Sequence, residues 1–267
     1  MTASTSTQTA LVTGASSGIG ESLAKCFARD GHSLVLVARS GDKLKALARS
    51  LEGECGVRVT VLPADLSKPG AAAGLASSLK RKRISVDVLV NCAGVLEQGA
   101  FLKMPAQRHQ ELIDLNVSGL TAMLAQFVPA MVERGRGRIL NVASVAAFQP
   151  VPSLATYAAT KAYVLSLSES LSEELRGSGV TVTALCPGIT DTPMVSNATA
   201  QSPALRKLPS FLIGDVESVA AEGYRACMNG EAIRVPGAIN LAATLAGRAT
   251  PKWLLRRIAG RMGRTAM

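Results

Sequence analysis

Aromatic residues are scarce in this sequence and make up only 3% of its 267 residues. Single-stranded nucleic acids are bound largely by bases stacking on aromatic side chains, so the formal charge of +10 does not by itself indicate such a partner. The charge is also unevenly distributed. Residues 241–267 carry six basic and no acidic side chains, which leaves +4 on the residues before them. We therefore expect no nucleic-acid partner.

Cysteine and histidine are also few. The five cysteines are odd in number, include no Cys-x-x-Cys pair and fall mostly in apolar segments. This pattern disfavours a disulfide framework or a zinc site and favours a reducing compartment. The only histidines are His32, after the first predicted helix, and His109, within a later one. We expect both at the surface and no metal site.

Long apolar runs are missing as well. No run approaches the roughly 18 residues that a membrane span needs. The polar start of the chain has neither the basic end nor the apolar core of a signal peptide, so residues 1–8 are interpreted as a flexible leader. No linker rich in Pro, Gly or Ser divides the rest. We expect a cytoplasmic protein with one domain over residues 9–238 and a helical extension over 239–267.

Apolar runs of strand length alternate with helical patterns along the chain. Because the apolar runs are continuous, they indicate buried strands of a parallel sheet with helices on both faces, a three-layer α/β fold. Strands are predicted at residues 10–12, 33–38, 57–62, 86–90, 138–142 and 180–185. Helices are predicted at residues 21–29, 41–53, 70–83, 106–134 with a kink near Pro129, 156–176, 238–246 and 251–262.

A glycine-rich turn follows the first predicted strand. It reads Thr13-Gly-x-x-x-Gly-x-Gly20, and Gly14, Gly18 and Gly20 allow a tight reversal, contact of a ligand with backbone, and close helix packing. Free N–H groups at the helix start favour a phosphate. The spacing differs from Gly-x-Gly-x-x-Gly. The same residues also spell Gly-x-Ser-x-Gly around Ser16, a hydrolase nucleophile elbow, but that interpretation needs a histidine partner and is disfavoured.

A second group of polar residues surrounds the fifth predicted strand. Ser144 follows that strand, and Tyr157 and Lys161 lie four residues apart on the next helix, so their side chains share one face. A fixed cation close to a phenol lowers its pKa, which would make Tyr157 an acid or base near neutral pH. Ser144 could then donate a hydrogen bond to a carbonyl oxygen. Taken alone, Tyr-x-x-x-Lys is a common accident.

Together these motifs closely resemble the short-chain dehydrogenase/reductase family over residues 9–194. The match rests on the Thr13 to Gly20 turn, Asp65, Asn91-x-Ala-Gly94, Asn116, Ser144, Tyr157-x-x-x-Lys161 and Pro187-Gly188 with Thr192, all in family order. It implies a Rossmann-like doubly wound sheet and reversible hydride transfer between a nicotinamide nucleotide and a carbonyl or alcohol. Cys92 departs from the family, which most often has asparagine there, and we expect only a local change in strand contacts.

The resemblance also implies a role for each matched residue. Tyr157 exchanges a proton with the substrate oxygen, and Ser144 orients that oxygen. Lys161 holds the nicotinamide ribose and lowers the pKa of Tyr157, while Asn116 supports a proton-relay water. The implied cofactor-binding residues are Gly14, Ser16, Ser17, Gly18, Ile19, Gly20, Arg39, Ser40, Asp65, Leu66, Asn91, Ala93, Gly94, Tyr157, Lys161, Pro187, Gly188, Ile189 and Thr192.

The end of the second predicted strand indicates which nucleotide is used. Arg39 lies 19 residues beyond Gly20, where an acidic residue would bind the ribose of NAD. Ala38 supplies no carboxylate, whereas Arg39 offers a fork of donors to a 2′-phosphate. The sequence therefore predicts NADP(H), with Ser40 and Ser16 as further contacts. The alternative is that Arg39 is only a solvated loop residue.

The substrate is less well defined by the sequence. Residues 189–215 would form a lid, and its apolar side chains suggest a hydrophobic ketone or aldehyde. Candidate lining residues are Val95, Leu96, Val145, Ala146 and Leu154. The resemblance implies a homodimer or homotetramer formed through the two long helices. The basic amphipathic helix predicted at 251–262 could lie on an anionic membrane or pack on protein. The rival function is an NADP-binding sensor or membrane-associated protein with little turnover.

Overall fold

The computed structural model describes residues 7–195 and 213–251, together with residues 253 and 257. Within these ranges one sheet of parallel strands has the order β3-β2-β1-β4-β5-β6-β7. The strands are β1 (Thr9–Thr13), β2 (Ser33–Val37), β3 (Val59–Val61), β4 (Val88–Asn91), β5 (Gly137–Val142), β6 (Val180–Leu185) and β7 (Ile233–Arg234).

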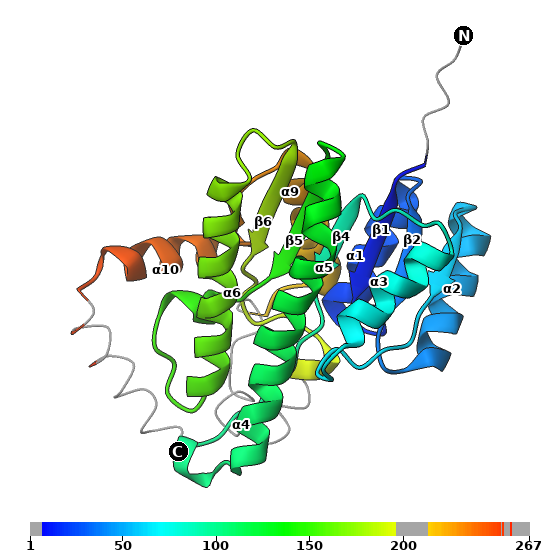
Figure 1. Ribbon diagram of the computed structural model, residues 1–267. Helices are drawn as coiled ribbons and strands as arrows, with labels where there is room; N and C mark the ends of the chain where they lie inside the picture. The colour runs from blue at the N-terminus through cyan, green and yellow to red at the C-terminus, as the bar shows by residue number, and fades with distance from the viewer. Residues whose placement is uncertain (1–6, 196–212, 252, 254–256, 258–267) are drawn as a thin grey trace.

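Helices cover both faces of this sheet, as Figure 1 shows. They are α1 (Gly18–Arg29), α2 (Gly41–Cys55), α3 (Ala71–Arg81), α4 (Ala106–Ile113), α5 (Leu120–Glu133), α6 (Ala155–Glu174), α9 (Val216–Asn229) and α10 (Ala238–Ala249). Short helical turns are η1 (Phe101–Lys103), η2 (Asp114–Gly119) and η3 (Val145–Phe148). The predicted three-layer α/β fold with a doubly wound parallel sheet is confirmed.

Alternation along the strands divides the buried side chains between two layers. In β1, Leu11 packs with the layer of α3, α5 and α6, whereas Ala10 and Val12 pack with the layer of α1, α2 and α9. Side chains on a strand point to opposite faces in turn, so a strand buried on both faces must be apolar throughout. The first helix also follows its pattern, because Leu23, Phe27 and their alanine neighbours are buried.

The strand order reverses between β1 and β4, which are hydrogen-bonded neighbours. In open α/β sheets a crevice forms at the carboxyl ends of the strands at such a point. Here the hydroxyl of Thr13 accepts hydrogen bonds of 3.0 Å from the backbone N–H groups of Cys92 and Ala93. It also donates one of 3.2 Å to the carbonyl oxygen of Val90. Thr13 therefore fastens the two loops that border the crevice.

The long helix predicted over residues 106–134 is interrupted. It consists of α4, the π-helical turn η2 and α5, and Pro129 lies within α5. A side chain at Gly119, the last residue of η2, would lie 2.5 Å from the carbonyl oxygen of Leu66. The chain therefore passes close to the loop after β3 at this turn. The π turn was not predicted; it contains Asn116, and such turns are frequent at functional sites. The kink near Pro129 stays a prediction.

The span Ala106–Glu133 is nevertheless long and apolar enough, by length and composition, to cross a membrane. The expectation that no segment approaches this length and apolarity is therefore wrong for this helix. Its α5 part packs against the sheet, with Met123, Leu124 and Met131 in the core. A core helix passes the same test, so this observation is weak evidence for a membrane span.

Two elements lie outside the predicted set. Asp215 caps α9 by accepting a 2.8 Å hydrogen bond from the N–H of Ser218, and buried Val219, Ala220 and Cys227 form the inner face of that helix. Its last turn leads to β7, whose two residues pair with Ala184 and Leu185. Most of the predicted lid at 189–215 and of the predicted helix at 251–262 lies outside the described residues.

The two histidines are less exposed than predicted. His32 is only 5% exposed, because its ring packs edge-on against Phe27, which in turn packs against Tyr224 of α9. His109 is partly buried, and its Nδ1 atom lies 2.7 Å from the Thr156 hydroxyl. The prediction that both are surface residues is wrong for His32 and inexact for His109. A helix distant in the sequence covers the first, and α6 contacts the second.

Candidate active site

A cavity of about 920 Å³ opens at the carboxyl edge of the sheet. It collects nearly all of the predicted site residues in one place, from seven separate segments of the chain. Of the predicted residues, its lining includes Gly14, Ser16, Ser17, Gly18, Ile19, Gly20, Arg39, Ser40, Asp65, Leu66, Ala93, Gly94, Ser144, Tyr157, Lys161, Pro187, Gly188, Ile189 and Thr192. Asn91 and Asn116 are not among the lining residues. Neither histidine lines the cavity, which leaves the hydrolase interpretation without its base.

The glycine-rich turn forms a cradle in which side chains would not fit. Gly14 has φ of +68°, and a Cβ there would lie 2.9 Å from the backbone of Ala93. Gly18 has φ of +58° and faces Thr192 across the cavity edge. A Cβ on Gly20 would lie 2.4 Å from the carbonyl oxygen of Gly14. The glycines therefore allow the tight turn and the close helix packing that the sequence predicts, and Gly14 also lets the loop after β4 approach. Contact of a ligand with this backbone stays a prediction.

The start of α1 suits a phosphate-bearing cofactor. Ser17 precedes the helix, and its side chain makes no capping hydrogen bond, so the first N–H groups of α1 are not capped by it. Uncapped N–H groups and the helix dipole attract anions. Arg39 also lines the cavity and makes no hydrogen bond or ion pair with any residue that the structure describes. These residues fit a dinucleotide carrying phosphates at two points.

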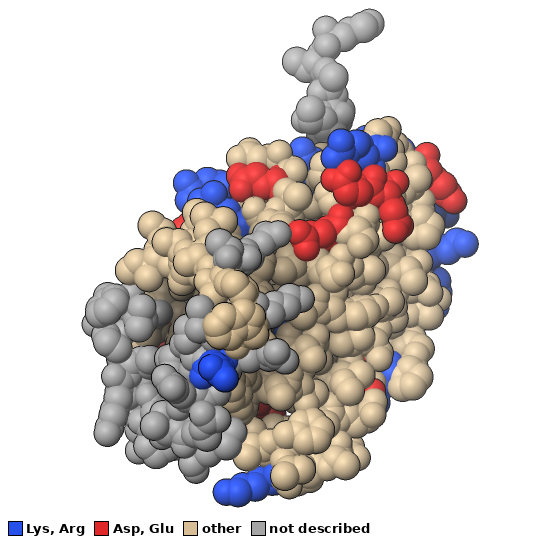
Figure 2. All heavy atoms as spheres, turned by 90° about the vertical axis from the view of Figure 1, so that its left-hand side faces the viewer, with Lys and Arg blue, Asp and Glu red and all other residues tan. Residues whose placement is uncertain are grey.

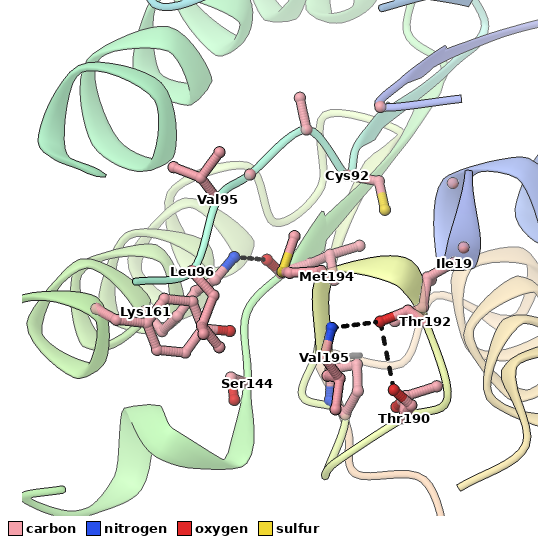
Figure 3. Close-up of a pocket in the computed structure, with 18 of the residues that line it drawn as sticks. Ile19, Cys92, Val95, Leu96, Ser144, Lys161, Thr190, Thr192, Met194 and Val195 are labelled. Atoms are coloured by element: carbon pink, nitrogen blue, oxygen red, sulfur yellow. Dashed lines mark hydrogen bonds between the residues drawn. The ribbon is translucent and has the colours of Figure 1, made fainter. Parts of the chain in front are cut away.

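Ser144, Tyr157 and Lys161 come together on one side of the cavity. Figure 3 shows Ser144 and Lys161 on this side and Ile19, Thr190 and Thr192 across from them. Ser144 caps η3, where its hydroxyl accepts a 3.1 Å hydrogen bond from the N–H of Ala146. Tyr157 and Lys161 lie one turn apart on α6, and both are buried. The predicted constellation of hydroxyl, phenol and amine is therefore assembled.

Burial dominates the acidity of the phenol. It raises the pKa of Tyr157 to about 12, and a hydrogen bond with the Ser144 side chain opposes this rise. The expectation that Lys161 lowers this pKa is not met, because the Nζ atom lies 5.8 Å from the ring centroid and desolvation outweighs it. Tyr157 is therefore a protonated hydrogen-bond donor at neutral pH.

The amine of Lys161 is affected by burial in the opposite sense. Desolvation lowers its pKa to about 8, because a buried ammonium loses its hydration. Its Nζ atom donates a 2.8 Å hydrogen bond to the carbonyl oxygen of Val142. A side chain at Gly94 would lie 3.2 Å from Oδ1 of Asn116 and 3.6 Å from this Nζ atom, so the loop after β4 passes close to both residues. Lys161 stays charged at neutral pH by a narrow margin.

Asn116, on the π turn η2, links the loop after β4 to helix α6. Its side-chain amide accepts a 2.9 Å hydrogen bond from the N–H of Val95 and donates one of 2.9 Å to the carbonyl of the same residue. A further hydrogen bond of 3.1 Å reaches the hydroxyl of Thr160 on α6. The side chain thus ties the loop after β4 to the helix that carries Tyr157. A role in a proton relay remains a prediction.

A buried polar chain that the sequence analysis missed runs beneath this site. The amide of Asn91 donates a 2.9 Å hydrogen bond to Asn141 of β5, and Asn141 donates one of 2.9 Å to Ser168 of α6. Ser168 then donates to the carbonyl oxygen of Val164. These three side chains are almost completely buried. Asn141 interrupts an apolar strand pattern, which was the available signal.

The loop after β3 closes the cavity beside Arg39. The Asp65 carboxylate accepts hydrogen bonds from the hydroxyl and the N–H of Ser67, at 2.7 Å and 3.1 Å. These bonds hold the pKa of that carboxyl below its usual value, with a smaller contribution from the positive charge of Arg39. Leu66 is buried beside it. Both residues line the cavity, and their contact with the nucleotide stays a prediction.

The segment after β6 borders the cavity near Gly18. The Thr192 hydroxyl donates a 3.3 Å hydrogen bond to the carbonyl of Thr190 and accepts one of 3.4 Å from the N–H of Val195. Thr190 also forms a β-bridge with Gly214. The residues on either side of 196–212 are therefore joined to each other at the edge of the cavity.

The cavity wall near Tyr157 is apolar. The five lining candidates named from the sequence, Val95, Leu96, Val145, Ala146 and Leu154, all line the cavity, and Met194 joins them. The thiol of Cys92 also lines it, and burial raises the pKa of this thiol to about 12. Its backbone N–H bonds to Thr13, so the departure at this position leaves the loop fastened. The wall thus offers few polar partners to a substrate.

Comparisons with known proteins agree with this site. A family model described as short chain dehydrogenase matches residues 8–203. Oxidoreductase UcpA of Escherichia coli (strain K12) is 39% identical over 196 residues, 73% of this chain and 74% of that protein. A short-chain dehydrogenase from Sphingobium yanoikuyae, solved with NADPH, has a TM-score of 0.80 and 37% identity over 90% of this chain and 92% of that one.

A second solved structure is similar to a comparable extent. The bulky-bulky ketone specific alcohol dehydrogenase from Comamonas testosteroni has a TM-score of 0.78 and 33% identity. The match covers 91% of this chain and 93% of that chain.

Proposed function

The chain belongs to the short-chain dehydrogenase/reductase family of oxidoreductases, and from this premise we propose that it reduces hydrophobic ketones or aldehydes with NADPH, or oxidises the corresponding alcohols with NADP. One observation carries the proposal. Ser144, Tyr157 and Lys161 meet in the cavity that also contains the glycine cradle and Arg39. When bound, a nicotinamide nucleotide supplies or takes up the hydride.

Proton transfer is assigned to Tyr157. The raised pKa keeps its phenol protonated at neutral pH, so in the reductive direction the hydroxyl donates its proton to the substrate oxygen, and solvent restores that proton. Ser144 stabilises the same oxygen by hydrogen bonding as negative charge develops on it. Lys161, held by its hydrogen bond to the carbonyl oxygen of Val142, is assigned to holding the nicotinamide ribose when the nucleotide is bound.

Cofactor preference is assigned to Arg39. Its guanidinium is unpaired among the described residues and lines the cavity one strand away from the glycine cradle. Phosphate is bound well by the planar fork of an arginine, and no carboxylate stands at Ala38 to repel it. The NADPH complex of the Sphingobium relative supports this assignment.

A hydrophobic carbonyl compound suits the apolar wall near Tyr157. Val95, Leu96 and Leu154 pack around the phenol together with Val151, and they leave mainly apolar contacts for a substrate. Binding sites of this kind derive affinity from apolar burial and orientation from a few polar groups. The ketone specificity stated for the Comamonas relative points in the same direction.

Oxidation of NADPH, and separately of NADH, by the purified protein tests the proposal. The panel contains aldehydes, cyclic ketones, ketosteroids, 3-ketoacyl esters and a polar sugar ketone as contrast. We expect turnover with NADPH on an apolar member and little on the sugar. A preference for NADH would overturn the role of Arg39, and turnover restricted to the sugar would overturn the substrate class.

A sensor with little turnover is the rival function. It would bind NADP without needing the phenol, whereas the structure retains hydroxyl, phenol and amine together in one cavity. If the protein binds NADPH measurably but oxidises it with no member of the panel, the rival function would be favoured.

Assembly through the long helices is part of the proposal. Ile113 at the end of α4, Val132 near the end of α5 and Tyr163 on α6 are exposed large side chains. A homodimer or homotetramer would cover them, as apolar surface of this kind marks protein contacts. Sedimentation of the purified protein measures the oligomeric state, and a monomer at micromolar concentration would contradict this part.

We propose that the protein is cytoplasmic. Its C-terminal extension would contact either an anionic membrane or protein. On α10, Ile239, Leu241 and Leu245 are exposed, and the six basic residues of 241–267 follow or accompany them. Figure 2 views the molecule from the side on which α10 projects in Figure 1. On the described surface in this view, most of the charged side chains lie toward the top. Sedimentation with anionic and neutral lipid vesicles distinguishes a membrane contact from packing on protein.

A further inference from the structure

A second basic side chain borders the cavity beside Arg39. Lys43 lies in the first turn of α2, lines the same cavity and is exposed. It makes no hydrogen bond or ion pair with a described residue. Its neighbour Lys45, by contrast, lies 3.6 Å from Asp42 and is absent from the cavity lining. Lys43 therefore borders the cavity, whereas Lys45 lies near Asp42 and does not.

The packing of α2 positions the turn that carries Lys43. Leu44 is completely buried, which sets the rotation of the helix about its axis. A side chain on Gly41 would meet Pro63 at 3.2 Å, so the first turn lies close to the loop after β3. Helical side chains lean toward the N-terminus of their helix. Because Lys43 lies in this first turn and lines the cavity, it borders the same end of the cavity as Ser40 and Arg39.

This end of the cavity collects positive charge. The side chain of Ser40 makes no capping hydrogen bond with α2, so the first N–H groups of that helix add a partial positive charge to Arg39 and Lys43. Asp65 is the acidic residue of the cavity lining, and its carboxylate is engaged by Ser67. An anion bound at this point would be attracted by Arg39, by Lys43 and by the partial positive charge at the start of α2.

We propose that Lys43 is a second specificity-determining residue, which binds the 2′-phosphate of NADP(H) together with Arg39. This inference rests on the proposed NADP(H) preference and deepens it. Arg39 supplies directional donors, and Lys43 supplies a mobile point charge on the opposite side of the same group. Preference for NADP(H) over NAD(H) is therefore shared between the loop after β2 and the first turn of α2.

Equilibrium titration of nicotinamide fluorescence with NADPH and NADH, in the absence of substrate, tests this proposal. The two nucleotides differ only in the 2′-phosphate, so the ratio of their dissociation constants isolates it. We expect Lys43→Ala to weaken NADPH binding about five- to tenfold and to leave NADH binding unchanged. Lys43→Glu should have a larger effect, and Lys43→Arg should retain most of the preference. Lys45→Ala is the matched control and should change neither constant.

The outcomes separate this inference from the proposed function. If the wild-type protein binds NADPH and NADH equally, both the cofactor assignment and the role of Lys43 are overturned. If the wild type prefers NADPH but Lys43→Ala keeps the full ratio, the role of Lys43 alone is overturned. Equal weakening of both nucleotides would likewise overturn it, because that result indicates damage to α2 rather than loss of a phosphate contact.

Discussion

The ammonium group of Lys161 lies 5.8 Å from the centre of the Tyr157 ring. Both side chains project from the same face of α6, and both are buried. Burial moves their pKa values apart, since that of the phenol rises from 10.0 to about 12 and that of the amine falls from 10.5 to about 8. At neutral pH each group is thus protonated, and the amine is the first of the two to lose its proton as the pH rises.

Replacing Lys161 by methionine should stabilise the protein while removing activity. A folded-state pKa of about 8, against 10.5 for the free side chain, means that folding disfavours the charged amine. The gain is offset in part by the lost hydrogen bond to Val142, so we expect a net increase of about 1–2 kcal/mol in the free energy of unfolding at pH 7. The buried charge of Lys161 lowers the free energy of unfolding of the wild type by its full amount below pH 8. This destabilisation disappears between pH 8 and about pH 10.5. Denaturant unfolding at pH 7 and pH 10 measures both; a difference independent of pH would contradict the assignment.

Replacing Tyr157 by phenylalanine should separate cofactor binding from turnover. The substitution removes one oxygen atom from a buried ring and keeps its packing against Leu112 and Ala158. We expect NADPH binding to persist and the rate of carbonyl reduction to fall by roughly 10²–10⁴-fold, the usual contribution of a positioned acid. Rates and binding constants of the two proteins are compared directly. Unchanged activity would remove Tyr157 from the chemistry and favour the sensor.

The chain of Asn91, Asn141 and Ser168 should position the helix that carries Tyr157 and Lys161. Asn141 bridges β4 and α6, so Asn141→Ala leaves the buried amide of Asn91 without an acceptor. We expect a loss of about 2–3 kcal/mol in unfolding free energy. Ser168→Ala should cost about 1–3 kcal/mol, because it leaves the buried amide of Asn141 without its acceptor. The pH dependence of kcat should also shift in both variants. Loss of stability with an unchanged pH profile would indicate a purely structural role.

Much of the fold follows from local patterns in the sequence. Strands β1, β2, β5 and β6 lie within a residue or two of the predicted apolar runs because a sheet buried on both faces requires such runs. Contacts distant in the sequence account for the differences. The π turn at Asn116 lies where Gly119 meets the carbonyl of Leu66, and no periodicity in the helix reports that contact. The two residues of β7 are too few to form a recognisable pattern.

The site could be predicted further than the fold because its motifs are local. The cavity collects the glycines of one turn and the Tyr157-Lys161 pair of one helix face, as their spacing indicates. The acidity of Tyr157 could not be predicted, since it depends on burial by surrounding elements rather than on the nearest charge. Lys43 was not predicted as a cavity residue, because a lysine in the first turn of a helix is ordinarily solvated.

Close packing at the glycine cradle should make Gly20 intolerant of a side chain. Gly20→Ala places a methyl group 2.4 Å from the carbonyl oxygen of Gly14, where backbone would have to move. We expect loss of nucleotide binding and a fall of several kcal/mol in stability. Gly74→Ala in α3 is the matched control, because nothing lies within 4 Å of its Cβ position. That control should gain about 0.5–1 kcal/mol from helix propensity. Similar behaviour of the two variants in thermal unfolding would refute the close contact.

Acidification should destabilise the protein through His32. Both ring nitrogens are buried without a hydrogen-bond partner among the described residues, and burial lowers the pKa of this side chain below 6.5, although Asp30 at 3.6 Å opposes the shift. The unfolded chain therefore binds a proton more readily than the folded one. The associated stability is complete above about pH 6.5 and is lost as the pH falls through the lower folded-state value. His32→Phe should keep the edge-on ring contact with Phe27 and flatten this slope. Urea unfolding of the two proteins between pH 7.5 and pH 5 measures it, and parallel slopes would show that other groups cause the acid sensitivity.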